Sequence, residues 1–234
     1  MTPMVSCAPF VHQPMTKVRC EEFLEAVSPA LACGDADALC RAVAQRWAPA
    51  DLCPLLGRTR AEVRRAAALT LGLVGGCEVV GALTRCLMDD DEAVHREAEN
   101  ALWSVWFRGG ADEAVGHFRA GVQAIAESRY PEALAALHRA TEVDPAFTEA
   151  HNQTGIAHYL QEEWSLSGEA CRRALALTPT HFGALAGLGH GYAHLGEYAK
   201  AVEAYERALM VNPRMSGLRE ACGRLRVRAE KVGR

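Results

Sequence analysis

The chain has 234 residues and a formal net charge of −4 at pH 7. Half of its residues are apolar but only 6% are aromatic, and this Ala- and Leu-dominated balance favours packed helices over β-sheet. The acidic balance excludes a general attraction to nucleic acid or anionic membranes. No apolar run approaches the roughly 20 residues of a membrane-spanning helix.

Residues 1–17 are expected to form a flexible tail. They do not resemble a secretory signal, because an early basic residue is missing and Pro3, Pro9 and Pro14 would break an apolar helix. The nine cysteines of the chain include no C-x-x-C pair. Reduced, mostly buried thiols in a cytoplasmic protein are therefore favoured over a disulfide framework or a zinc site.

The segment that follows, roughly residues 34–107, has an internal period. A shift of 31 residues lays the stretch 61–74 on 92–105 and matches, among others, Leu71 with Leu102. The pattern resembles the short HEAT-like repeat of the phycobilisome-lyase group, in which Val-Arg opens the first helix. The resemblance implies paired helices, expected near residues 35–47, 50–57, 61–74, 77–88 and 92–107.

Charged residues in this segment are expected to have structural roles. The acidic run Asp89–Glu92 should cap the following helix, where carboxylates meet free N–H groups and the positive end of the helix dipole, rather than bind calcium. Arg60, Arg64 and Arg65 could bind an acidic partner or a phosphate, but a solvated or packing role is favoured.

The last of these helices has no partner helix of its own kind. Trp103, Trp106 and Phe107 are therefore expected to bury against the first hairpin of the C-terminal half, which would give one continuous solenoid. Gly109 and Gly110 follow them and predict a helix C-cap and a hinge.

A second period, of 34 residues, covers the C-terminal half. Prolines, glycines, alanines and one aromatic recur at this spacing; they are Pro145, Pro179, Pro213, Gly121, Gly155, Gly189, Ala140, Ala174, Ala208, Tyr130, Trp164 and Tyr198. Small residues let two helices approach closely, and proline ends each hairpin. The pattern resembles the tetratricopeptide repeat. It implies helices at 114–127 with 130–143, 148–161 with 164–177, and 182–195 with 198–211.

The predicted fold class is therefore all-α, a right-handed α-solenoid. A last helix, near residues 216–230, places Leu218, Cys222, Leu225 and Ala229 on one face and suits a terminal cap. The expected domains are a tail (1–17), HEAT-like repeats (18–110), three tetratricopeptide repeats (111–215, as 114–147, 148–181 and 182–215) and a capping helix (216–234).

In tetratricopeptide arrays the first helix of each hairpin lines a concave groove that holds a peptide or a partner helix. Carried over by position, the resemblance implies a partner-binding groove made of Phe118, Val122, Ile125, Asn152, Gln153, Ile156, Tyr159, His190 and His194. The alternative is that the N-terminal half covers Phe118, Val122 and Ile125.

Chaperone-binding members of the family hold an acidic tail with cations on these first helices. The corresponding positions here are Phe118, Val122, Gln153, Gly183 and Gly187, so no cation remains to pair with a carboxylate. A chaperone-tail partner is not expected.

No cofactor, metal or catalytic residue is predicted. His190 and His194 have the i, i+4 spacing that can chelate a metal. A third ligand is not obvious, and the candidates for one are His158 and His181. Ordinary hydrogen bonding by the pair is favoured. The sequence also contains no Gly-rich phosphate loop and no nucleophile elbow.

The function predicted from these features is a non-enzymatic, cytoplasmic adaptor. It would bury apolar side chains of another protein in the groove, with Asn152, Gln153 and Tyr159 orienting the bound segment. Two alternatives stay open: an accessory or lyase-like protein that acts on a chromophore-bearing partner, and a weak nucleic-acid binder that uses the basic C-terminal helix.

Overall fold

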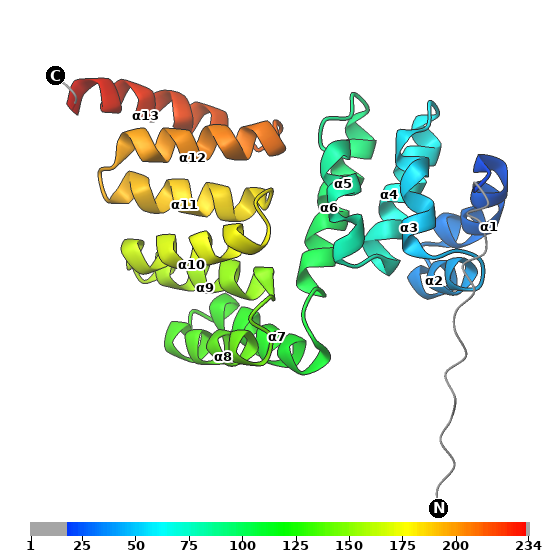
Figure 1. Cartoon of the computed structure of the whole chain (residues 1–234), viewed down its shortest axis with the longest axis horizontal. Coiled ribbons are helices and arrows are strands. Elements are labelled where there is room, and N and C mark those ends of the chain that lie inside the picture. The colour runs from blue at the N-terminus through cyan, green and yellow to red at the C-terminus, as the bar shows by residue number, and fades with distance from the viewer. Residues whose placement is uncertain (1–17, 233–234) are drawn as a thin grey trace, which may run out of the picture.

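The computed structural model describes residues 18–232, so the expected tail (1–17) lies outside the described residues. Within this range the regular structure is helical and contains no strand (Figure 1). The helices of the N-terminal half are α1 (Cys20–Cys33), α2 (Ala36–Ala44), α3 (Pro49–Leu52) with the 3-10 turn η1 (Cys53–Gly57), α4 (Ala61–Val74), the turn η2 (Cys77–Val79) with α5 (Val80–Cys86), and α6 (Glu92–Phe107).

The C-terminal half consists of three helical hairpins and a final helix. Within each hairpin the two helices approach so closely that a glycine of the first helix leaves no room for a side chain. A Cβ on Gly189, for example, would lie 2.4 Å from the Tyr205 ring. Leu218, Cys222 and Leu225 of the final helix are buried, as a capping helix requires. The helices are α7 (Asp112–Ala126) with α8 (Tyr130–Val143), α9 (Thr148–Leu160) with α10 (Trp164–Leu177), α11 (Phe182–His194) with α12 (Tyr198–Val211), and α13 (Leu218–Val232).

The positions matched by the 31-residue period form the core of the N-terminal half. Leu71 on α4 and Leu102 on α6 are both fully buried. No helix was predicted before residue 35, but α1 spans 14 residues there. It contains Pro29, which obscures the helical pattern, and it ends at Gly34 in the left-handed conformation (φ 66°). The HEAT-like resemblance itself stays a prediction.

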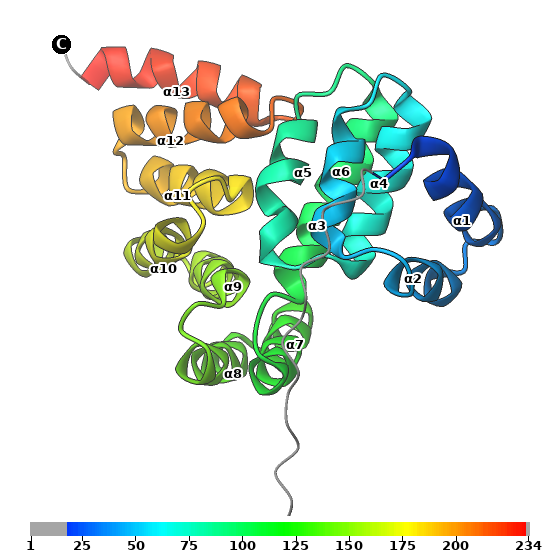
Figure 2. The same cartoon turned by 45° about the vertical axis from the view of Figure 1, so that its right-hand side comes forward.

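The chain turns back at residues 108–111. The two halves of the α-solenoid therefore lie side by side. Figure 1 shows α6 running past the stacked hairpins in the direction opposite to their order, and the turned view of Figure 2 agrees. No helix in residues 18–232 is long and apolar enough to cross a membrane.

This return path corrects one prediction. Phe107 packs against Phe118 of the first hairpin as expected, with 5.2 Å between ring centroids. The prediction that Trp103 and Trp106 also bury there is wrong, because both pack against Phe182 at the start of the third hairpin, each at 5.2 Å. The apolar pattern of α6 predicts which face of the helix is buried, but not the direction that the chain takes after the turn.

The Gly109–Gly110 pair does not cap α6, because Arg108 occupies the C-cap position. Gly110 instead allows a close approach between the halves: a Cβ there would lie 2.3 Å from Cδ1 of Phe147, which is itself buried. Neither glycine of the pair is among the residues of positive φ.

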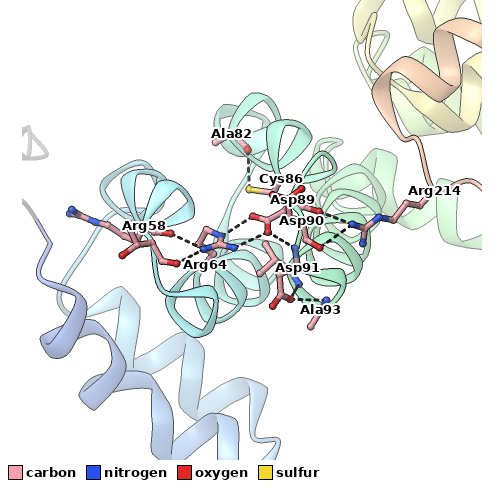
Figure 3. Close-up of polar contacts among 11 residues, drawn as sticks. Arg58, Arg64, Ala82, Cys86, Asp89, Asp90, Asp91, Ala93 and Arg214 are labelled. Carbon is pink, nitrogen blue, oxygen red and sulfur yellow. Dashed lines mark hydrogen bonds and ion pairs between the residues drawn. The ribbon is translucent and has the colours of Figure 1, made fainter.

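The acidic run caps α6 and also joins the two halves (Figure 3). Asp91 accepts hydrogen bonds from the N–H groups of Ala93 and Val94, as predicted. Asp89 receives two hydrogen bonds from Arg64, at 2.7 and 2.8 Å, and this contact holds the pKa of Asp89 below its ordinary value. From the third hairpin's end, Arg214 donates to the Asp89 carbonyl oxygen at 2.8 Å.

The eight cysteines of the described residues are free thiols. Cys86, Cys171 and Cys222 are buried, three others are half-buried, and Cys33 and Cys77 are exposed, so the prediction that most of the thiols are buried is wrong. Burial raises the pKa of the Cys86 thiol to about 11 and that of Cys171 to about 12.

Candidate partner-binding surface

The accessible part of the predicted groove lies on the second halves of α9 and α11, which contact each other. Ile156 is 36% exposed, and His194 is also exposed. Leu160, which was not among the predicted groove residues, lies one helical turn after Ile156 and is 44% exposed. Tyr159 and His190 are half-buried beside them. We call these five residues the open α9–α11 surface.

Hydrogen bonds and stacked rings hold the polar members of the open α9–α11 surface. The Tyr159 hydroxyl lies 3.0 Å from Nε2 of His194, whose ring stacks on Trp164 with 4.0 Å between centroids. The Tyr205 hydroxyl lies 2.6 Å from Nδ1 of His190. Burial, and then the proximity of His194, lower the pKa of His190, so its ring is neutral at neutral pH.

The histidine pair does not gain a third metal ligand. His158 contacts Glu163 at 2.6 Å and His181 contacts Glu149 at 2.9 Å, so both are engaged elsewhere. Across residues 18–232, no group of three or more His, Cys, Asp or Glu side chains is arranged to hold a metal ion.

Two residues expected in the groove are buried around Glu149, a carboxylate that was not predicted to have a role. Glu149 is fully buried and accepts hydrogen bonds from Asn152 at 3.1 Å and Gln153 at 2.8 Å. Asn152 is 2% exposed and Gln153 9%. Both amides satisfy a buried charge and are not accessible to a partner, which corrects the expectation that they line an open groove.

The fourth member of this buried group links it to the N-terminal half. His181 is fully buried and accepts a hydrogen bond at Nδ1 from the Ala184 N–H, so its proton is on Nε2, which donates to Glu149 at 2.9 Å. Its ring stacks on Trp106 with 3.9 Å between centroids. Trp103 lies so close that a Cβ on Gly183 would be 2.6 Å from its ring.

A sequence signal for Glu149 did exist. The equivalent positions of the first and third repeats, 34 residues before and after Glu149, are Val115 and Gly183. Glu149 is therefore the only charged residue at this repeat position. A charged residue at a repeat position that is uncharged in the other repeats, close to the start of a helix, indicates a buried hydrogen-bond partner, which here is His181.

The first hairpin contributes less to the surface than expected. Phe118 is 1% exposed because it packs between Phe107 and Phe147, at 5.2 and 4.8 Å. Val122 and Ile125 are half-buried against the same cluster. The alternative prediction, that the N-terminal half covers these residues, is therefore correct for Phe118.

Two tetratricopeptide-repeat family models match the C-terminal half, one over residues 118–182 and one over residues 183–215. Among curated proteins, anaphase-promoting complex subunit 3 of Schizosaccharomyces pombe is 32% identical over 92 residues, which is 39% of this chain and 14% of that protein. A TPR repeat-containing protein of Rhizobium etli is 30% identical over 91 residues, or 39% of this chain and 45% of that protein. This chain thus spans less than half the length of these relatives.

Solved structures of tetratricopeptide domains are similar to about half of this chain. The Sgt2 TPR domain from Aspergillus fumigatus is 18% identical with a TM-score of 0.50, covering 53% of this chain and 83% of that one. The first TPR of Spaghetti (RPAP3), bound to an HSP90 peptide, is 21% identical with a TM-score of 0.47, covering 52% and 94%. The two family models, which match residues 118–182 and 183–215, show that this part of the chain consists of tetratricopeptide repeats, as the 34-residue period predicts.

Proposed function

We propose that this chain is a non-enzymatic adaptor that holds a segment of another protein on the open α9–α11 surface. The observation that carries the proposal is the exposure of neighbouring apolar side chains, Ile156 and Leu160, on the helix of a repeat array. The proposal includes the cytoplasmic location predicted from the sequence.

Binding would draw on burial of the partner's apolar side chains. Each aliphatic side chain that moves from water onto Ile156 and Leu160 contributes about 1.5–3 kcal/mol when its burial is complete. Tyr159 and His194 are already fixed by their mutual hydrogen bond. Little conformational entropy is therefore lost at these two side chains on binding, and they can orient the segment.

The HSP90 peptide of the Spaghetti structure is not proposed as the partner. The positions that would hold an acidic tail carry no cation, and in this fold Phe118 and Gln153 are buried and Gly183 lies under the Trp103 ring.

The test compares capture of partners from the native cell by the tagged full chain and by its variants, with identification by mass spectrometry. The double variant Ile156→Ala/Tyr159→Ala is expected to lose about tenfold in affinity for the specific partner. Ile156→Glu should do the same while it preserves the Tyr159–His194 hydrogen bond. Met210→Ala, at a side chain 69% exposed on α12, is the matched control. Unchanged capture by folded variants refutes the proposal.

A further inference from the structure

A cleft of about 470 Å³ lies where the final helix meets the third hairpin. Ala193 of α11 and Tyr205 of α12 form one side of it, and α13 contributes Arg224, Val227 and Arg228 to the other. The cleft thus combines an apolar side chain that is 53% exposed, Val227, with two guanidinium groups.

The sequence of α13 explains why these side chains meet. Leu218, Cys222 and Leu225 are buried against α12, whereas Arg224 and Arg228 are four residues apart and therefore share one face. Arg226 is directed elsewhere and bonds to Glu206.

Neither cleft arginine is held by a strong contact. Arg224 pairs with Glu220 at 2.6 Å, but the two side chains are 63% and 78% exposed, so the pair contributes little and can exchange for another carboxylate. The Arg228 guanidinium lies over the Tyr198 ring, 5.9 Å from its centroid. Both cations can therefore turn toward a ligand at small cost.

Side-chain contacts connect the cleft to the open α9–α11 surface. Tyr205, which lines the cleft, lies 2.6 Å from His190 through its hydroxyl, and the His190 ring lies 6.0 Å from that of Tyr159. The open α9–α11 surface itself carries no Lys, Arg, Asp or Glu. An extended segment that follows this path meets apolar side chains first and two cations at the end.

We propose that the partner segment carries an acidic residue beside its apolar residues, and that Arg224 and Arg228 bind this carboxylate while Val227 covers the side chain next to it. This inference rests on the proposed function and adds the chemical class of the partner. The cations come from the capping helix, and charge-assisted hydrogen bonds from two guanidinium groups favour a carboxylate over a neutral amide.

A nucleic acid fits the same cleft less well. Tyr205 is 2% exposed, so its face is not open for a base to stack on, and the chain carries a net charge of −4. Nucleic-acid binding is therefore kept as an outcome of the test.

The experiment pans a random displayed peptide library against the full chain. The enriched peptides are expected to contain apolar residues next to Asp or Glu. The variant Arg224→Glu/Arg228→Glu should still enrich apolar peptides but lose the acidic preference, and Arg224→Gln/Arg228→Gln, which adds no repulsion to Glu220, should do the same. Arg207→Glu/Arg219→Glu makes the same charge change at exposed residues outside the cleft and should behave as the wild type.

An enriched peptide and its Glu→Gln form then serve as fluorescent probes. The wild type is expected to bind the acidic form about tenfold more tightly at low salt, with the preference falling at high salt. The Arg224→Gln/Arg228→Gln variant should bind both forms equally.

Each contrary result has one meaning. Apolar peptides without an acidic residue refute this inference and leave the proposed function standing. No enrichment, or enrichment unaffected by Ile156→Glu, refutes both. A labelled single-stranded RNA that binds the chain through Arg224 and Arg228, without any preference for acidic peptides, also overturns the inference.

Discussion

Glu149→Gln tests the buried group at the junction of the second and third hairpins. The substitution keeps the shape of the side chain but replaces one carboxylate oxygen by an amide NH₂. That NH₂ faces either Nε2–H of His181 or the donors of Asn152 and Gln153. His181 cannot move its proton to Nδ1, because Nδ1 accepts the Ala184 N–H.

The cost follows from the number of donors left without an acceptor. One buried donor without a partner costs about 1–3 kcal/mol, and the remaining hydrogen bonds lose the strengthening that a charged acceptor gives. Together these effects predict a loss of about 3 kcal/mol in the free energy of unfolding. In a chain of this length that loss lowers the melting temperature by roughly 6–12 °C.

Urea unfolding followed by circular dichroism measures this loss. Glu163→Gln is the matched control, because Glu163 also contacts a histidine, but its side chain is 44% exposed, so its loss should stay below about 1 kcal/mol. Equal unfolding free energies for Glu149→Gln and the wild type, within about 0.5 kcal/mol, would refute the assignment of Glu149 as a buried hydrogen-bonded carboxylate.

Two further predictions concern Gly110 and His190. Gly110→Ala should lower the free energy of unfolding in urea by about 1–3 kcal/mol, since its Cβ would overlap Phe147. The control Gly116→Ala, which has open space around it in α7, should raise it slightly. A Gly110→Ala variant as stable as the wild type would contradict the close approach and support a hinge instead. Because the folded chain holds the pKa of His190 below its ordinary value, the unfolded chain takes up this proton first as the pH falls, so stability is lost below about pH 6.5. His190→Gln should reduce that loss, and a difference between variant and wild type that stays constant from neutral to acidic pH contradicts the reasoning.

The tetratricopeptide hairpins could be predicted closely from the sequence. Their helices begin and end within two residues of the expected positions, because a 34-residue period fixes the spacing of turns and small residues. The period assigns a face to each residue but does not reveal which neighbour covers that face. Asn152 and Gln153 lie on the expected helix, but their amides donate hydrogen bonds to Glu149. The position of Glu149 in turn depends on its contact with His181 in the next repeat.

The N-terminal half shows the same limit over a longer distance. The apolar pattern of α6 predicts its bounds correctly. The contacts of Trp103 and Trp106 depend on the direction of the chain at residues 108–111, for which local patterns carry no signal. The arginines of the α13 cleft were visible as a basic segment, but only the packing of α13 on α12 separates Arg224 and Arg228 from Arg226.

The bond from Arg214 to the Asp89 carbonyl joins residues 125 positions apart. Repeat arrays ordinarily contain only contacts between neighbouring units, and their ends open independently. Here the third hairpin contacts the second hairpin and also α6 and the loop that precedes α6. The array should therefore open as one cooperative unit, with slower folding from its long-range contacts and uniform protection of α9 and α11 in hydrogen exchange.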